Sequence, residues 1–311
     1  MDGKKITAGA NKQTRAVWDL LVETYREWSQ DNAPTLGAAL AFYTTFSLAP
    51  LLIVVIAVVG FIFGRAQVQA EILHRLQEVA GPEGARAVKI MLSAAFRPGS
   101  GLPATIIGLA VLLYGATRTF VMLRQALNLM WGVKPNPHVD LKGYLTVQLL
   151  SFALVLGIGF LLVLSLLASA GLAAVSRFMG DVLPLPVFFF QVANLIFSIA
   201  LLTLLVAIVF KVLPEVEIAW SDVWIGSAIT ALLFTLGNFI LGRYLAKSSI
   251  SSAYGAASSL AVLLFWVYYS AQILFLGAEF TQVYANKYGS KVQPRAKPRG
   301  SGRSEAPGTR P

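Results

Sequence analysis

The chain has 311 residues, 56% of them hydrophobic and only 13% charged, and it contains no cysteine. A soluble domain is typically about 25% charged, so this chain has too few polar side chains to cover a soluble core. Disulfides, thiolate metal sites and cysteine nucleophiles are excluded. Because the apolar residues form long blocks, the net charge of +10 indicates membrane topology and contact with anionic lipid rather than nucleic acid.

The first 30 residues are polar and lack the apolar core of a cleaved signal peptide. Residues 1–15 are basic, and we expect them to form a disordered tail. Residues 16–32 are too polar to span a bilayer, but they repeat apolar side chains at helical spacing, namely Val17, Leu21, Tyr25 and Trp28. This pattern fits a helix at the membrane surface and, equally, a cytosolic helix packed on the bundle.

Residues 36–63 form the first predicted membrane span. Asp31 or Asn32 is expected to cap this helix, and Pro50 is expected to kink it midway. The chain then turns polar again. There we expect a small extracytoplasmic insertion at about residues 65–100, built of two short amphipathic helices broken at Gly81 and Pro82.

Five further spans follow, each an apolar block long enough to cross a bilayer. The second begins near residue 102 and ends among polar residues, and the others cover about residues 145–175, 186–212, 223–245 and 259–284. Residues 291–311 are rich in Lys, Arg, Pro, Gly and Ser and are expected to be disordered. The predicted fold is all-α, with a six-helix membrane domain over residues 16–290 between two basic tails.

The basic residues predict the orientation. If both termini are cytoplasmic, about two thirds of the 25 Lys and Arg residues lie on the cytoplasmic side, as the positive-inside rule requires. An even number of spans agrees with basic tails at both ends. We therefore expect both termini in the cytoplasm, where the tails meet anionic headgroups.

Four stretches carry a family resemblance: AALAFYTTFSLAPLL at residues 38–52, QALNLMWGVK at 125–134, FKVLPEVEIAW at 210–220, and YGAASSLAVLLFWVYYSAQILFLGAEFTQVY at 254–284. No single stretch is specific, but the set in this order resembles the YihY/BrkB family of bacterial inner-membrane proteins. The resemblance covers residues 15–290. It implies a six-helix protein of the inner membrane. Members have been labelled a ribonuclease or a virulence or serum-resistance factor, and transport roles have been suggested.

Glu279 is the only acidic residue inside the predicted spans, and it shares a helix face with Tyr268, Gln272 and Leu276. An ionisable group at membrane depth is costly and usually faces the bundle interior. Glu279 is therefore either a proton relay or substrate contact, or half of a structural pair. Its candidate partner is Arg118, which shares one side of the second span with Asn128; alternatively, the Arg118 side chain reaches the headgroups.

Three more polar sets lie at helical spacing inside the spans. They are Tyr43 with Ser47 and Pro50, Asn194 with Gln191 and Ser198, and Asn238 with Ser227 and Thr230. Interhelical hydrogen bonds account for most residues of this kind, and many proline kinks serve only packing. A polar substrate path is the other interpretation.

The sequence does not support an enzyme. A nuclease needs a metal cluster or an acid–base set, yet the only histidines, His74 and His138, are predicted on opposite sides of the membrane. The phosphate-binding glycine loop of ATPases is absent. We predict no catalytic residue, metal or cofactor, and the ribonuclease label finds no support.

Two functions remain. The polar helix faces and the kinked first helix favour a transporter or lipid-handling protein of undefined substrate, although the absence of a mid-membrane acidic pair weakens the case for ion coupling. The alternative is a non-transporting scaffold that binds envelope proteins through its insertion and basic tails. Membrane lipids are the expected partners, and a homo-oligomer stays open. The candidate polar site comprises Glu279, Arg118, Gln272, Asn128, Tyr43, Asn194 and Asn238.

Overall fold

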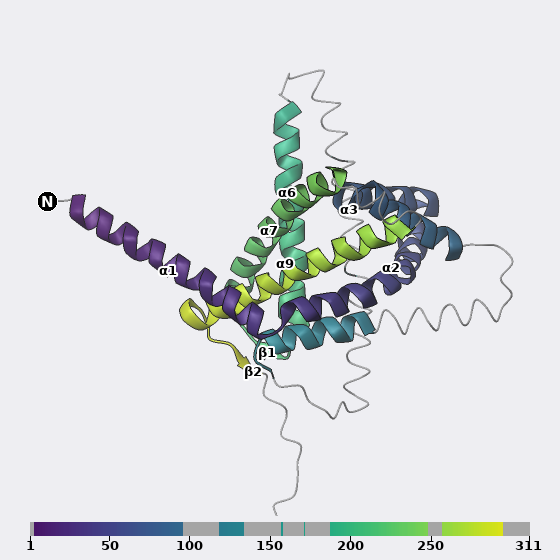
Figure 1. Ribbon diagram of the computed structural model, residues 1–311. Helices are drawn as coiled ribbons and strands as arrows, with labels where there is room; N and C mark the ends of the chain where they lie inside the picture. The colour runs from purple at the N-terminus through teal and green to yellow at the C-terminus, as the bar shows by residue number, and fades with distance from the viewer. Residues whose placement is uncertain are drawn as a thin grey trace, which may run out of the picture.

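The computed structural model describes residues 3–95, 118–133, 157, 171, 187–247 and 257–294. Its long helices are α1 (Gly3–Gln30), α2 (Ala33–Phe63), α3 (Arg65–Ala95), α6 (Val187–Val212), α7 (Trp220–Lys247) and α9 (Ser258–Tyr288). A further helical segment covers residues 118–130. Two strands of two residues each, β1 (Val216–Glu217) and β2 (Gln293–Pro294), pair in an antiparallel manner. The fold is all-α, as predicted (Figure 1).

Three helices in the described part of the chain are long and apolar enough to cross a membrane. They are Val192–Val212 in α6, Trp220–Tyr244 in α7 and Ser258–Tyr288 in α9, and they coincide with the last three predicted spans. α2 coincides with the first predicted span and has no charged residue along its 31 residues. The second predicted span is described only from residue 118, and the third lies outside the described residues except for residues 157 and 171. The number six therefore stays a prediction.

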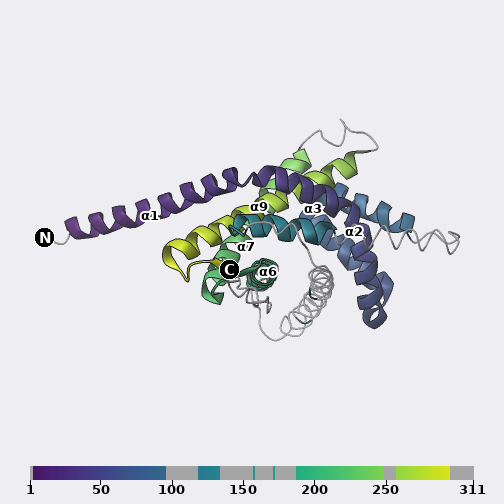
Figure 2. The same ribbon diagram turned by 90° about the horizontal axis from the view of Figure 1, so that it is seen from below.

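The N-terminal helix begins earlier than predicted. α1 starts at Gly3, so residues 3–15 are helical where a disordered tail was expected. This stretch contains Lys, Ala, Gln and Arg, which favour helices, and no proline, so it continues the helix of residues 16–30 without a break. Figures 1 and 2 show α1 extending away from the other helices toward the N-terminus.

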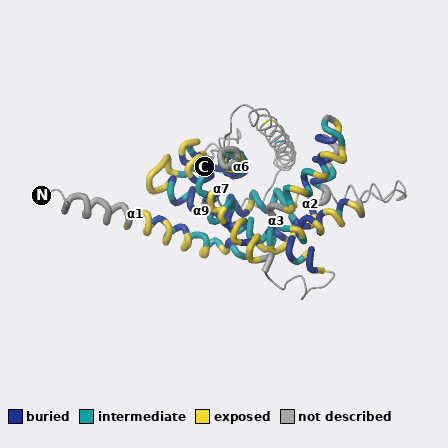
Figure 3. The backbone as a smooth tube through the Cα atoms, turned by 90° about the horizontal axis from the view of Figure 1, so that it is seen from above, coloured by how far each residue is buried: buried dark blue, intermediate teal, exposed yellow. Residues whose placement is uncertain are grey.

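The two sides of α1 differ in burial. Leu20 is buried in a small apolar cluster with Phe280 and Val283 of α9, and Glu23 forms an ion pair with Lys287. Another side of the helix exposes an apolar stripe of Val17, Trp18, Leu21, Val22 and Tyr25. Figure 3 shows exposed stretches of α1 in yellow. The helix thus packs on the bundle, and it still presents the aromatic surface that a position at the membrane surface requires.

α1 and α2 meet at a two-residue turn. Asn32 adopts the left-handed region there, with φ 53°, and makes no side-chain cap bond. The expected capping by Asn32 is wrong, because an N-cap residue needs a more extended backbone than this one has. Instead, Asn32 Nδ2 donates to Gln30 O at 3.3 Å. α2 is helical through Pro50, and its ribbon bends along its length in Figure 2. The predicted kink at Pro50 itself stays a prediction.

α3 confirms the predicted break of the insertion. Gly81 has φ 74° and ψ 175°, a conformation that favours glycine, and Pro82 follows it. Both halves of α3 pack on α2 in one apolar cluster that includes Val68, Ile72, Val88, Leu92, Ile56 and Val59. The insertion therefore folds against the bundle.

α7 and α9 approach each other closely through a reciprocal pair of contacts. Thr281 of α9 lies over Gly226 of α7, and Thr230 of α7 lies over Gly277 of α9. Each threonine hydroxyl donates to a carbonyl of its own helix, Thr230 Oγ1 to Gly226 O at 2.7 Å and Thr281 Oγ1 to Gly277 O at 2.6 Å. Small residues allow close helix approach in membrane bundles. We call these four residues the α7–α9 seam.

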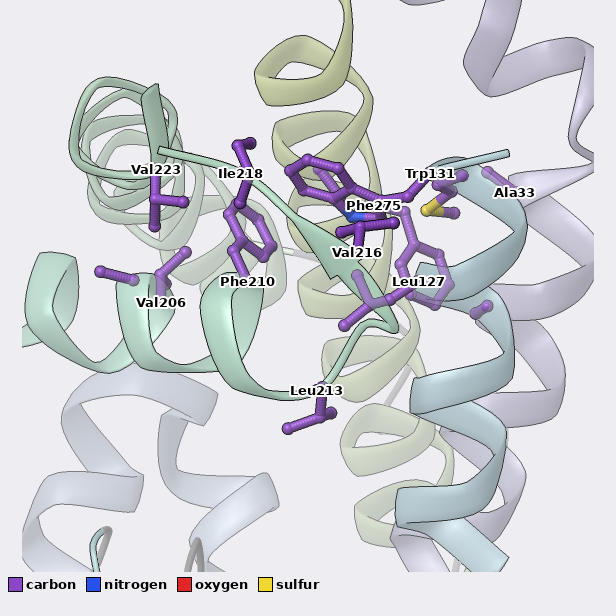
Figure 4. Close-up of a cluster of buried hydrophobic side chains, with 14 of the residues drawn as sticks. Ala33, Leu127, Trp131, Val206, Phe210, Leu213, Val216, Ile218, Val223 and Phe275 are labelled. Atoms are coloured by element: carbon purple, nitrogen blue, oxygen red, sulfur yellow. The ribbon is translucent and has the colours of Figure 1, made fainter. Parts of the chain in front are cut away.

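The largest apolar cluster joins the segment 118–133 to α6, α9 and β1 (Figure 4). Trp131 meets Phe210 of α6 edge-on, with ring centroids 6.5 Å apart. Leu127, Val216 and Phe275 are buried in the same cluster. This cluster fixes the α6–α7 link against α9.

The C-terminal tail begins later than predicted. β2 pairs with β1, so that Pro294 lies opposite Val216 and Gln293 lies opposite Glu217. Residues 291–294 therefore have a defined structure, because the backbone groups of the α6–α7 link take their hydrogen bonds from the chain that follows α9. Residues 295–311 lie outside the described residues.

Candidate functional site

The start of α2 lies against the polar face of α9. A Cβ atom on Gly37 would overlap Gln272 Nε2, and the Tyr268 ring lies 3.7 Å from the same position. Gln272 Nε2 also contacts Ala33 O at 3.5 Å. These contacts confirm that Tyr268 and Gln272 share one face of α9, as their spacing predicts.

Glu279 lies two turns further along α9 and is buried, with 1% of its surface exposed. Its carboxyl group is hydrogen-bonded to the carboxyl group of Asp31 in the α1–α2 turn. Glu27 of α1 is a third acidic group close to both. Burial raises the pKa of Asp31; the hydrogen bond from Glu279 opposes this rise, and the charge of Glu27 adds to it. We call Asp31 and Glu279 the acid pair.

The predicted partner of Glu279 was Arg118. The structure gives Glu279 the carboxyl group of Asp31 as its hydrogen-bond partner, whereas the Arg118 side chain is exposed at the start of the segment 118–133. The pairing of Arg118 with Glu279 stays a prediction, and a variant described below tests it.

Six buried polar atoms on α7 and α9 have no hydrogen-bond partner within the described residues. They are Ser227 Oγ, Asn238 Oδ1, Trp266 Nε1, Ser270 Oγ, Gln272 Oε1 and Glu279 Oε1. An unpaired buried polar atom costs about 1–3 kcal/mol, so each of these atoms needs water, a solute or a polar group from elsewhere in the chain. Of the polar set predicted on α7, only Thr230 is satisfied within its own helix.

A second polar cluster surrounds the α6–α7 link. Asn128 Oδ1 accepts a hydrogen bond from the Glu215 N–H at 2.9 Å, and Arg124 Nη2 lies 2.6 Å from Glu215 Oε1. Asn128, a predicted site residue, therefore attaches the link to the segment 118–133. Its contacts are those of a structural residue and lie on a different helix from Glu279.

Asp222, in the first turn of α7, holds the end of α9. Its Oδ2 accepts hydrogen bonds from Ser290 N at 2.8 Å and from Ser290 Oγ at 2.7 Å. Sequence reasoning placed Asp222 just before the fifth span and missed this role. The available signal was an acidic residue in a first helical turn, where the helix dipole favours negative charge.

Other predicted residues do not join the acid pair through any contact in the described structure. Tyr43 is half-buried beside Phe42, with ring centroids 5.7 Å apart. Ser47 Oγ lies 2.9 Å from Thr119 Oγ1 and thereby links α2 to the segment 118–133. Asn194 is exposed on α6.

Among the described residues, no group of three or more His, Cys, Asp or Glu side chains is arranged to hold a metal ion. His74 is exposed on α3, and His138 lies outside the described residues. What the α2–α9 contact offers chemically is therefore the acid pair, of which Glu279 is buried and Asp31 half-buried, together with amide and hydroxyl groups. Sequence reasoning missed Asp31 in this role, because it was considered only as a helix cap.

Helices of membrane-spanning length with buried polar groups between them define a polytopic helical membrane protein. Residues 24–301 match the model of the family described as virulence factor BrkB, so the chain belongs to this family. The resemblance drawn from the four sequence stretches is thereby confirmed.

Curated relatives carry the name UPF0761 membrane protein. The one from Tolumonas auensis is 28% identical over 268 residues, which cover 82% of this chain and 82% of the relative. The one from Ralstonia nicotianae is also 28% identical, and the match covers 81% of this chain but 56% of the relative. The one from Albidiferax ferrireducens is 27% identical, with 92% and 67% covered. No solved structure matches this chain.

Proposed function

We propose that this chain is a transporter of the bacterial inner membrane for a polar or amphipathic solute, and that the α2–α9 contact forms part of the solute path. The observation that carries the proposal is a set of buried polar atoms on α9 without a described partner, which includes Trp266 Nε1, Ser270 Oγ and Gln272 Oε1. In hydrocarbon, such atoms are costly unless water or solute reaches them. They favour a path that is wet in some state of the protein over a permanently dry bundle.

We also propose that both termini are cytoplasmic, which is supported by the distribution of Lys and Arg. Because the chain has no native cysteine, one introduced thiol reports its own side of the membrane. A cysteine at Glu83 should react with an impermeant thiol reagent from outside the cytoplasmic membrane, and a cysteine at Asn136 should not. The reverse pattern would overturn the orientation.

The alternative is a non-transporting scaffold for envelope proteins. The α7–α9 seam favours it, because two helices that fit so closely do not part easily to admit a solute. The scaffold would use α3 and the basic ends of the chain to hold its partners.

Reconstitution into liposomes with a panel of lipids and metabolites separates the two functions. We expect flux of at least one panel solute, strongly reduced in Gln272→Leu and Ser270→Ala. The matched control is Thr235→Val, because Thr235 Oγ1 is already bonded to Ala231 O of its own helix at 2.8 Å. No flux across the panel, together with capture of envelope proteins that requires α3, would replace the transporter by the scaffold.

A further inference from the structure

The acid pair raises a question of hydrogen-bond chemistry. Two ionised carboxylates are both acceptors, so neither can donate the hydrogen bond that joins Asp31 to Glu279. A proton on one of them supplies the missing donor. Glu279 is the more deeply buried member, and no N–H or other donor of the described residues reaches its Oε1.

We propose that Asp31 and Glu279 form a binding site for one proton, which Glu279 carries and donates to the Asp31 carboxylate, and that this bond fastens the α1–α2 turn to α9. The proposal does not depend on solute transport. When the proton leaves to water, the charge of the pair changes from −1 to −2. Two like charges at hydrogen-bond distance then repel each other.

The charged groups around the pair reinforce this behaviour. From α1, Glu27 faces the pair and is itself 3.3 Å from Arg26, while Glu23 is paired with Lys287 of α9. α2 contributes no charged residue. On α1, Glu27 therefore adds negative charge near the acid pair. The cations Arg26 and Lys287 lie against Glu27 and Glu23 and not against the acid pair.

Several charged groups on the remaining elements around α9 are paired elsewhere. On α3, Arg75 pairs with Glu71 at 2.9 Å and Arg86 with Glu83 at 3.9 Å. On α7, Asp222 accepts hydrogen bonds from Ser290. In the segment 118–133, Arg124 pairs with Glu215. Whether Arg118 acts on Glu279 is tested by the Arg118→Gln variant in the second experiment.

A buried residue beside the pair reports its opening. Ala33 follows the α1–α2 turn, is fully buried, and its carbonyl oxygen contacts Gln272 of α9. A thiol at position 33 is thus covered while the turn lies on α9 and is uncovered when the turn lifts. Ser93 on α3 is exposed and serves as the reference position for the intrinsic reactivity of a thiol.

The first experiment detects the proton itself. Infrared spectroscopy of the purified full chain should show the C=O stretch of one buried carboxylic acid, which disappears as pH rises. The band should be absent in Glu279→Gln, whose amide still donates to Asp31. It should disappear at lower pH in Asp31→Asn, whose amide donates to an ionised Glu279. No such band in the unchanged chain, or a band unaffected by both variants, overturns the proposal.

The second experiment measures the fastening. The labelling rate of Ala33→Cys, divided by that of Ser93→Cys at the same pH, should rise by up to about tenfold per pH unit as pH approaches the apparent pKa of the closed pair, and should level off above it, because opening releases one proton only while the closed pair still holds it. In the Glu279→Gln background the ratio should not change with pH. An equal rise in both backgrounds overturns the proposal. So does a carboxylic acid band that appears only in Arg118→Gln, since Glu279 would then be the ionised partner of Arg118.

Discussion

α9 makes two contacts of opposite chemistry on its two sides. Gly277 and Thr281 face α7, whereas Glu279, two residues from each, points the other way toward the α1–α2 turn. The α7–α9 seam depends on shape, and the turn side depends on hydrogen bonds and charge. The contact of α9 with α7 is therefore independent of protonation, whereas its contact with the α1–α2 turn depends on it. The turn can move without disturbing the seam.

The largest expected effect comes from overfilling the seam. Gly277→Leu forces atoms into the place of Thr230, whose hydroxyl is already bonded to its own helix. Overpacking costs typically about 1–3 kcal/mol, and here little room exists for relief. We expect a clear fall in the unfolding temperature in detergent, or loss of folded protein.

Gly242→Ala on α7 is the control for the seam, because a Cβ atom there meets nothing within 4 Å. Alanine favours a helix over glycine by about 1 kcal/mol, so this variant should match or exceed the unchanged chain in stability. Equal unfolding temperatures for Gly277→Leu and Gly242→Ala would show that the close contact of Gly277 with Thr230 does not contribute to stability.

The turn side should respond to pH, and the seam should not. Because the folded-state pKa of Asp31 is raised, its contribution to stability is present below the usual carboxyl range and is lost as pH rises through the folded-state pKa. We expect Asp31→Asn to flatten the fall in unfolding temperature between mildly acidic and neutral pH. Thr230→Ser should shift the whole curve without changing its shape; a curve as steep in Asp31→Asn as in the unchanged chain would contradict this.

A smaller effect is expected at the contact of α2 with α9. Gly37→Ala displaces the end of the Gln272 side chain, which is flexible and can move away. We expect a loss below about 1 kcal/mol, because the gain in helix propensity offsets part of the strain. In a Gln272→Ala background the same change should be neutral or stabilising. Equal and additive effects in both backgrounds would mean that the two residues do not touch.

The smallest effect is expected at the C-terminus. Deletion of 295–311 removes no described contact and should leave the unfolding temperature unchanged. Deletion of 292–311 also removes β2 and the bond from Val292 N to Asn286 Oδ1, and should lower it slightly while membrane insertion persists. Loss of the inserted protein in either truncation would show that the tail is needed for folding.

Local signals in the sequence predicted much of the fold. Apolar block length located α6, α7 and α9, and Gly81 with Pro82 located the break in α3. The start of α1 was missed, because a basic composition was taken for disorder although its residues favour helices. The structure of residues 291–294 was not predicted, because no local pattern in four residues indicates strand pairing with the distant Val216.

The candidate site was only half visible in the sequence. Glu279 was identified from its cost at membrane depth, and Gln272 from its spacing on the same face. Asp31 lies in a turn at the other end of the chain, and no local pattern connects it with Glu279. Charge complementarity suggested Arg118, whereas the structure provides a second carboxyl group, a pairing that becomes favourable only with a shared proton.

Because the chain is synthesised from its N-terminus, the α1–α2 turn is made long before α9, the helix onto which it docks. Ala33 and its contact Gln272 are separated by 239 residues, which a ribosome adds in a time on the order of tens of seconds. Throughout that interval the docking helix of the turn is not yet complete. Closure of the turn onto α9 must therefore be among the last steps of assembly, and a nascent chain arrested before residue 272 should keep position 33 open to a thiol reagent.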